Sequence, residues 1–193
     1  MGVNSFLDLD LSEQRLGAIE ALGWTVPTPI QAEAIPPGLA GTDVVGIAQT
    51  GTGKTGAFMI PALERLRSGG GLQVLALCPT RELAQQVSDD TASLAMGTNI
   101  RTAAIFGGVG YGPQIEALES GFEVIVATPG RFIDHAHSKR VDLSNVNCLV
   151  LDEADRMLDM GFIRDVKKIM RFFPRESKRQ TLLFSATFSP AIR

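Results

Sequence analysis

The sequence predicts an α/β fold in which a mainly parallel sheet carries helices on both faces. Short apolar stretches rich in Val, Ile and Leu alternate with segments long enough for a crossover helix. The stretches are continuously apolar, a pattern typical of parallel strands that are buried on both faces. The six predicted strands are 43–48, 72–78, 101–106, 123–127, 148–151 and 181–184.

Two helices are predicted ahead of the first strand. Residues 12–22 form the first, opened by Ser12 as N-cap. Residues 29–39 form the second, in which Thr28 is the N-cap, Pro29 takes the first helical position and Gln31 can complete a capping box. We expect this helical region, 1–41, to pack on the same domain as the core, 42–193.

The final residues, 189–193, have the pattern of a helix that has only begun. Ser189 suits an N-cap and Pro190 the first helical position, and the sequence then stops. One helical turn is not stable alone. This pattern predicts that the chain is a fragment of a longer protein.

Composition is that of an ordinary globular protein and excludes disordered and fibrous classes, since 45% of the 193 residues are hydrophobic and 20% are charged. The net charge of −3 is uneven: residues 1–155 hold 9 basic and 18 acidic side chains, whereas 156–193 hold 9 and 3. We interpret the basic segment as a solvated helix face rather than a nucleic-acid patch. Because the chain as a whole is acidic, any nucleic-acid-binding face must be confined to one region of its surface.

Cysteine usage and hydropathy indicate a protein of a reducing compartment. Cys78 and Cys148 lie in apolar stretches far apart, which suits buried reduced thiols better than a disulfide or metal site. No apolar stretch approaches the roughly 18 residues that suggest a membrane span. We predict a cytoplasmic protein without membrane contact, and nothing in the sequence demands more than a monomer.

A glycine-rich segment at 48–55, Ala-Gln-Thr-Gly-Thr-Gly-Lys-Thr, follows the first strand and opens a helix. Glycines let backbone N–H groups turn towards phosphates, and the helix N-terminus adds partial positive charge. Lys54 can reach phosphate oxygens and the Thr55 hydroxyl can bind Mg²⁺. Ala48 stands where the general phosphate-loop pattern has its first glycine. The predicted phosphate-binding residues are Gln49, Thr50, Gly51, Thr52, Gly53, Lys54 and Thr55.

The acidic segment 152–155, Asp-Glu-Ala-Asp, directly follows the fifth strand. An isolated acidic tetrad is usually a solvated loop, but its position after a strand matches the second half of a nucleotide site. Asp152 can hold Mg²⁺ and Glu153 can polarise an attacking water.

Polar clusters also follow other strands: 79–81, 107–108, 128–131 and 185–187. The carboxyl ends of parallel strands share one edge, where α/β sheets collect their ligands. Each cluster taken singly is equally well explained as a turn, because Pro, Gly and Thr are turn residues.

Together these motifs resemble the N-terminal RecA-like domain of DEAD-box RNA helicases, a P-loop NTPase fold, from Phe6 to Thr187. The resemblance rests on Phe6, the Q motif at 23–31, and the segments 48–55, 79–84, 107–108, 128–131, 152–155 and 185–187. Ala48 is the residue usual in that family, whereas Trp24 stands where Phe or Tyr is more common.

The resemblance implies roles in binding ATP or ADP with Mg²⁺. Gln31 would recognise the adenine edge and Phe6 would stack on its ring. Lys54 would bind phosphates, Thr55 and Asp152 the metal, and Glu153 would activate water. The residues implied to couple the nucleotide state to RNA strand separation are Asp155, Ser185 and Thr187.

The resemblance also implies sequence-independent contacts with the RNA backbone, weakened by salt. A second RecA-like domain supplies arginine fingers in this family, so the 193 residues alone should bind adenine nucleotide, hydrolyse it poorly and not unwind RNA. The implied RNA-binding residues are Pro79, Arg81, Gly107, Gly108, Thr128, Gly130 and Arg131.

Three alternatives remain open from the sequence. A DNA helicase of related architecture would share the phosphate loop and the acids. The longer protein could be an ATP-gated RNA clamp rather than a processive unwinder, or a nucleotide-binding module without an RNA role. His135 and His137 do not predict a metal site, because positions i and i+2 of a helix face different ways, and we expect both at the surface.

Overall fold

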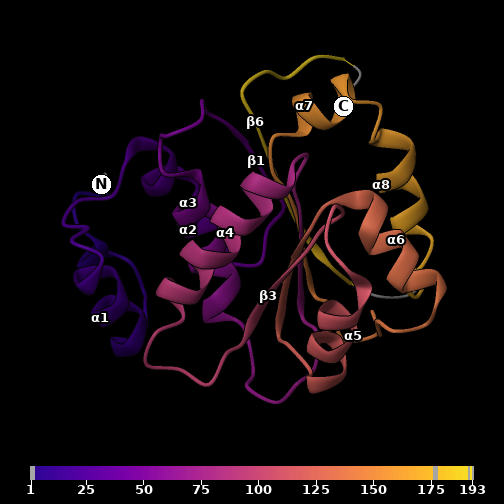
Figure 1. The fold of residues 1–193 in the computed structure, drawn as a ribbon. Coiled ribbons are helices and arrows are strands. Elements are labelled where there is room, and N and C mark those ends of the chain that lie inside the picture. The colour runs from indigo at the N-terminus through magenta and orange to yellow at the C-terminus, as the bar shows by residue number, and fades with distance from the viewer. Residues whose placement is uncertain (1–2, 176–177, 191, 193) are drawn as a thin grey trace.

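A six-stranded parallel sheet lies between two layers of helices in the computed structural model, which describes residues 3–175, 178–190 and 192 (Figure 1). The strand order is β1-β6-β5-β2-β4-β3, and every neighbouring pair is parallel. The predicted α/β class and parallel sheet are confirmed. The strands are β1 Val44–Ile47, β2 Val74–Leu77, β3 Thr102–Ile105, β4 Val124–Ala127, β5 Cys148–Leu151 and β6 Gln180–Ser185.

Every predicted strand is present, and its ends lie within two residues of those predicted. The two predicted helices ahead of β1 are present as well, over Glu13–Ala21 and Pro29–Leu39. Ser12 caps the first by accepting from the N–H of Arg15 at 3.3 Å. Local periodicity and capping residues are therefore sufficient to locate these elements.

The helices divide between the two faces of the sheet. Helices α1 to α4 cover one face and α5 to α8 cover the other (Figure 1). Alternate residues of the central strand β2 point to opposite layers: Val74 and Ala76 join the first apolar cluster, Leu75 and Leu77 the second. The helices are η1 Phe6–Asp8, α1 Glu13–Ala21, α2 Pro29–Leu39, α3 Lys54–Glu64, α4 Arg81–Leu94, α5 Tyr111–Ser120, α6 Pro129–His137, α7 Ala154–Asp159 and α8 Ile163–Met170.

The N-terminal helices share a core with the helix that follows the phosphate loop. Ile19 of α1 and Ile35 of α2 are buried in the same apolar cluster as Phe58 of α3. The buried Arg15 guanidinium also reaches Glu64 Oε1 at 3.1 Å and the main-chain carbonyl of Leu94. This packing holds α1 against α3 and α4.

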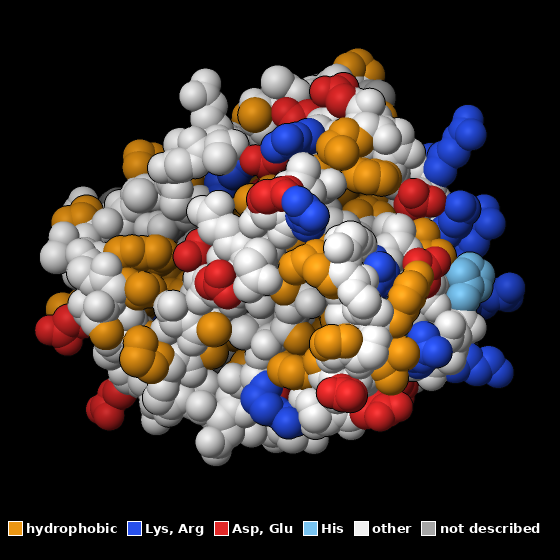
Figure 2. Space-filling model, viewed as in Figure 1, with side chains coloured by type: hydrophobic (Ala, Val, Ile, Leu, Met, Phe, Trp, Pro, Cys, Tyr) orange, Lys and Arg blue, Asp and Glu red, His pale blue; other side chains and the backbone are white. Residues whose placement is uncertain are grey.

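Charged side chains gather on the outer face of α8, visible at the right of Figure 2. Lys167 and Lys168 are exposed there, whereas Val166 and Ile169 point into the core. This amphipathic arrangement agrees with the predicted solvated face. Cys78 and Cys148 are buried free thiols, as predicted.

Parts of the predicted C-terminal helix, Ala191 and Arg193, lie outside the described residues. Within the described part, the N–H of Ile192 donates to the carbonyl of Ser189 at 3.0 Å, which closes a turn. In the part of the chain that the structure describes, no helix is both long and apolar enough to cross a bilayer.

Candidate functional site

The strand order divides the predicted motifs into two groups along one edge of the sheet. β1, β6 and β5 are neighbours, so the phosphate loop after β1 lies beside 185–187 and 152–155. β2, β4 and β3 form the other half of the sheet, and the segments after them hold the predicted RNA-binding residues. Because all six strands are parallel, both groups lie at the carboxyl edge.

The phosphate loop requires glycine at two positions. Gly51 and Gly53 have φ angles of +84° and +87°, a left-handed conformation that glycine adopts without steric cost. Gly53 is the N-cap of α3, so Lys54 begins the helix and the free N–H groups of the first turn face the loop. The Thr52 hydroxyl donates to the Gln49 carbonyl at 2.6 Å and braces the turn.

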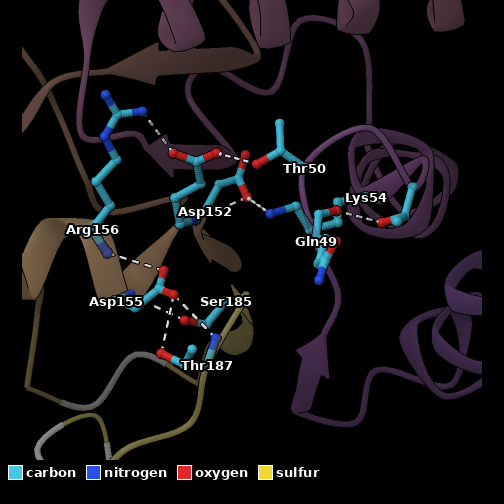
Figure 3. A network of polar contacts seen from close by, with 10 residues as sticks. Gln49, Thr50, Lys54, Asp152, Asp155, Arg156, Ser185 and Thr187 are labelled. Carbon is cyan, nitrogen blue, oxygen red and sulfur yellow. Dashed lines mark hydrogen bonds and ion pairs between the residues drawn. The ribbon is translucent and has the colours of Figure 1, made fainter.

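Lys54 and Asp152 form a buried ion pair at the centre of the site (Figure 3). Their charged atoms are 3.8 Å apart, which is longer than a hydrogen bond, and Lys54 Nζ has no hydrogen-bond partner among the described residues. Burial raises the pKa of Asp152 to about 6, although the Lys54 charge opposes the shift and Glu153 adds to it. A buried ammonium without an acceptor suits an anionic ligand such as phosphate.

Glu153 is held by donors on both oxygens. The Thr50 hydroxyl donates to Oε1 at 2.9 Å, and Arg156 Nη1 lies 3.3 Å from Oε2 (Figure 3). The main-chain φ angle of Glu153, +50°, is unusual for a residue other than glycine. The main chain is thus turned so that the carboxylate faces the phosphate loop.

Asp155 joins the acidic segment to the end of β6. The Thr187 N–H and hydroxyl both donate to Oδ2, at 3.0 and 3.1 Å, while the Asp155 N–H donates to Ser185 Oγ at 3.1 Å (Figure 3). Burial acts to raise the pKa of Asp155, but hydrogen bonds, including those from Ser185 and Thr187, hold it below its ordinary value. The structure therefore brings together the three residues that the sequence predicted as a coupling group.

Gln31 lies beside the phosphate loop with its amide engaged at both ends. Oε1 accepts from the Thr28 N–H at 3.0 Å, and Nε2 donates to the Gly53 carbonyl at 3.0 Å. The predicted capping box at the start of α2 is present, with the Gln31 side chain reaching back to the N–H of Thr28. Phe6 is buried against Trp24, with ring centroids 6.4 Å apart.

The cavity at the phosphate loop has a volume of about 140 Å³. Lys54, Thr55, Asp152 and Glu153 line it together with Gln86 and Asp90 of α4, which were not singled out from the sequence. Its volume is below the roughly 300 Å³ at which pockets enclose a drug-sized ligand. It suits a phosphate group, and a whole nucleotide would need the loop and Gln31 to rearrange.

The oxygen donors at this cavity fit Mg²⁺. Thr55 and Asp152 both line it, and Mg²⁺ is usually held by one or two protein oxygens together with phosphates and water rather than by an all-protein cage. The described residues hold no group of three or more His, Cys, Asp or Glu suited to a metal.

The predicted RNA-binding residues converge on the loop after β3. A Cβ at Gly108 would lie 3.2 Å from Arg81 Nη1, so these segments from β2 and β3 are in contact. Arg131, from the start of α6, donates to the Val109 carbonyl through both Nη atoms at 3.0 Å and lies 4.0 Å from the Tyr111 ring centroid. In this structure Arg131 braces the loop. Pro79, Gly107, Thr128 and Gly130 occupy the same edge.

The expectation that His135 is at the surface is wrong. His135 is fully buried, and Nε2 lies 3.1 Å from Oε1 of Gln114. Burial, followed by the charges of Arg140 and Arg131, lowers its pKa. The packing of α5 on α6 encloses it, and sequence spacing cannot reveal such a contact between helices. His137 is exposed, as expected.

Arg156, which pairs with Glu153, is a further neighbour of the site that the sequence analysis did not single out. Its spacing of three residues from Glu153 on α7 is the only sequence signal for this ion pair.

The chain is similar to known helicases along almost its whole length. The sequence profile of the DEAD/DEAH box helicase family matches residues 28–193. The DEAD-box ATP-dependent RNA helicase CshA of Bacillus subtilis (strain 168) is 45% identical over 190 residues, covering 98% of this chain and 38% of that protein. A crystal structure of a DEAD box protein from the hyperthermophile Methanococcus jannaschii superposes with a TM-score of 0.94 at 42% identity, covering 100% of this chain and 52% of that one.

Proposed function

Because the chain belongs to the DEAD/DEAH box helicase family, we propose that it is the ATP-binding domain of an ATP-dependent RNA helicase that couples ATP binding and hydrolysis to local separation of RNA strands. The chain spans about two fifths of the length of the curated relative and about half of the solved one. We therefore propose the helicase activity for a full-length protein of that kind and not for the 193 residues alone.

Lys54 supplies the charge that binds the phosphates. Its ammonium is buried, lacks a hydrogen-bond acceptor and stands at the N-terminus of α3, where main-chain N–H groups add partial positive charge. A bound phosphate would provide the missing acceptors. This single observation carries the proposal.

Thr55 and Asp152 would hold Mg²⁺ against the nucleotide. The ion would neutralise charge that develops on the phosphates during transfer. Glu153 would then accept a proton from the attacking water, because Thr50 and Arg156 hold its carboxylate towards the phosphate loop. The Thr50 hydroxyl occupies one oxygen in the present structure, so this bond must be exchanged before water can bind there.

Gln31 and Phe6 would recognise adenine after a local rearrangement. Each end of the Gln31 amide makes one hydrogen bond in this structure, and its second N–H and second lone pair can pair with the adenine edge once the buried side chain is uncovered. Nucleotide binding would thereby pull on the phosphate loop and on the N-terminus of α2 at once.

The Asp155, Ser185 and Thr187 group would transmit the nucleotide state to the RNA. It joins α7, which follows the proposed catalytic acids, to the last strand of the sheet through three hydrogen bonds. RNA would bind through its backbone at the other half of the edge, along Pro79, Arg81, Gly107, Gly108, Thr128, Gly130 and Arg131.

The 193 residues alone should hydrolyse ATP poorly and should not unwind RNA. A second RecA-like domain would supply the arginine fingers, and such an arginine accelerates phosphoryl transfer by roughly 10³ to 10⁵ in related hydrolases. We propose that the isolated domain is monomeric and that the longer protein acts in the cytoplasm.

Calorimetric titration with Mg-ADP and Mg-GDP tests the proposal. We expect saturable binding of Mg-ADP and much weaker binding of Mg-GDP. The Gln31→Ala variant should lose this preference, and Lys54→Ala should lose measurable affinity for both nucleotides. Lys167→Ala is the matched control, because it removes an exposed lysine of α8 and should bind as the parent does.

Absence of binding to either nucleotide would reject the site as a self-sufficient nucleotide site. Equal binding of the two nucleotides by the parent chain would reject the adenine-recognition role of Gln31 while leaving the phosphate role of Lys54 intact. The two roles are thus tested separately.

A further inference from the structure

A polar groove opens at the edge of the sheet opposite the nucleotide site. Its volume is about 660 Å³, within the range of pockets that hold small ligands. It lies where β2 and β5 begin, the edge at the bottom of Figure 1, and none of the roles proposed above uses it. The lining residues are Arg65, Arg67, Gly70, Gln73, Asn145 and Asn147.

Hydrogen bonds preform the wall of the groove. The buried Gln73 side chain donates to the Arg67 carbonyl at 2.7 Å and accepts from the Arg67 N–H at 3.0 Å. Asn145 Nδ2 donates to the Gly70 carbonyl at 3.0 Å. The loop between α3 and β2 is therefore fixed to the strands, so little ordering would be needed on binding.

Several donors in the groove lack acceptors. Among the described residues, the Arg67 guanidinium and the Asn147 side-chain amide make no hydrogen bond or ion pair. Arg65 uses one nitrogen, Nη1, to reach Gln180 Oε1 at 2.6 Å. Arg65 is the C-cap of α3 and suits the partial negative charge of that helix end, but Arg67 lies beyond the last turn.

Among the residues that the structure describes, no carboxylate lines the groove. Two nearby carboxylates already accept hydrogen bonds from main-chain N–H groups. Asp43 accepts from the Thr181 N–H at 2.7 Å. The buried Glu123 accepts from the N–H groups of Gly69 and Arg101 at 3.0 and 2.8 Å. The unpaired donors therefore face the groove without a neutralising partner in the described part of the chain.

We propose that this groove binds a small phosphate-bearing anion that has no aromatic base. Guanidinium groups match phosphate oxygens with paired N–H donors, and the Asn147 amide adds a neutral donor. The described residues of the lining include no aromatic side chain on which a base could stack, which disfavours nucleotides and single-stranded RNA. Inorganic pyrophosphate and sugar phosphates share the required chemistry.

Titration of the ¹⁵N-labelled chain with inorganic pyrophosphate, followed by NMR without divalent metal, tests this site. We expect saturable shifts of the main-chain amides of Gly70 and Asn147, separate from any shift of Gly51 in the phosphate loop. Arg67→Gln should weaken the groove response at least tenfold. Arg164→Gln, which removes an exposed arginine of α8, is the matched control and should leave it unchanged.

A second variant and one further ligand make the test independent of one substitution. Asn147→Asp places a negative charge in the groove and should abolish the response while amide dispersion shows that the fold is retained. Ribose 5-phosphate producing the same shifts would extend the site to sugar phosphates, and a response to pyrophosphate alone would assign it to inorganic anions.

Three results would overturn the proposal. Shifts confined to Gly51 and its neighbours would show that pyrophosphate binds only at the phosphate loop. An equal loss of affinity in Arg67→Gln and Arg164→Gln would show non-specific attraction to positive charge. Tighter binding of a uridine oligonucleotide than of pyrophosphate at Gly70 and Asn147 would assign the groove to RNA. The nucleotide site lies at the other end of α3, so its failure in calorimetry would leave this test unaffected.

Discussion

Replacing Lys54 and Asp152, singly and together, tests whether the nucleotide site is stabilised by its own ion pair. Both side chains are buried, and their charged atoms are 3.8 Å apart. Lys54→Met removes the cation with little change in length, and Asp152→Asn removes the negative charge while preserving shape. Each single variant leaves one buried charge without its partner.

The magnitude follows from the separation of the charges. At an effective dielectric constant of about 20, unit charges at this distance attract by about 4 kcal/mol. The desolvation of two buried ions offsets most of that gain. Because the pair is too long for a hydrogen bond, we expect Lys54→Met to cost about 2 kcal/mol, below the 3 to 5 kcal/mol typical of breaking a tighter buried pair. Asp152→Asn should be at least as stable as the parent at pH 8, because burial raises the pKa of Asp152 to about 6 and so disfavours its ionised form in the folded state. The double variant should be at least about 2 kcal/mol more stable than the parent, because it also removes the unpaired charge that each single variant leaves.

Urea unfolding at pH 8 without nucleotide or metal measures the four proteins of this cycle. We expect a coupling energy of about 4 kcal/mol, and loss of Mg-ADP binding in every variant. Additive changes, with the stability change of the double variant equal to the sum of the two single changes, would refute the interpretation that the two charges interact across a buried gap.

Three further predictions concern local features. Gly46→Ala should destabilise the fold by about 2 kcal/mol in urea unfolding, because the new Cβ would lie 2.4 Å from the Phe184 ring; an unchanged midpoint would show that the ring can move. The folded state raises the pKa of Asp152 from 3.8 to about 6, so it binds this proton more tightly than the unfolded state does. Its contribution to stability is therefore full below about pH 4 and is lost as the pH rises to 6, by at most about 3 kcal/mol. Urea unfolding of the metal-free parent and of Asp152→Asn, measured at several pH values between 4 and 7, should show that only the parent loses stability as the pH rises. The same pH dependence of stability in both proteins would contradict this prediction. Thr187→Val removes one of two bonds to Asp155 Oδ2, and it should raise the pKa of that carboxyl, measured by ¹³C NMR, with a stability loss under about 1 kcal/mol; no change in pKa would show that the main-chain N–H bond suffices.

Local patterns in the sequence predicted the elements of the fold and most of the nucleotide site. The six apolar stretches appear as strands because continuous runs of β-branched and aliphatic residues stabilise parallel strands buried on both faces. The candidate phosphate loop was recognisable because its pattern lies in consecutive residues: glycines at 51 and 53 for left-handed turns, then Lys54 at the start of a helix. Such features depend on neighbours in the chain, so the sequence alone is sufficient for them.

Side-chain environments that depend on two distant segments were not predictable. His135 is buried because α5 lies against α6, and a spacing rule within one helix gives no information on that contact. The pairing of Gln31 with the Gly53 carbonyl, 22 residues away, depends on how α2 packs beside α3. The groove brings together Arg67 and Asn147, which are far apart in the sequence.

The sequence by itself therefore determined the α/β class, the positions of the strands and the residues of the phosphate loop and acidic segment. The tertiary structure alone decided the strand order β1-β6-β5-β2-β4-β3, which places the phosphate loop, the acids and the Ser185 segment on three adjacent strands and the candidate RNA contacts on the other three. The reason is that parallel strands of similar apolar composition can pair in many orders with similar local energy. Only the packing of helices onto the two faces of the whole sheet selects one of them.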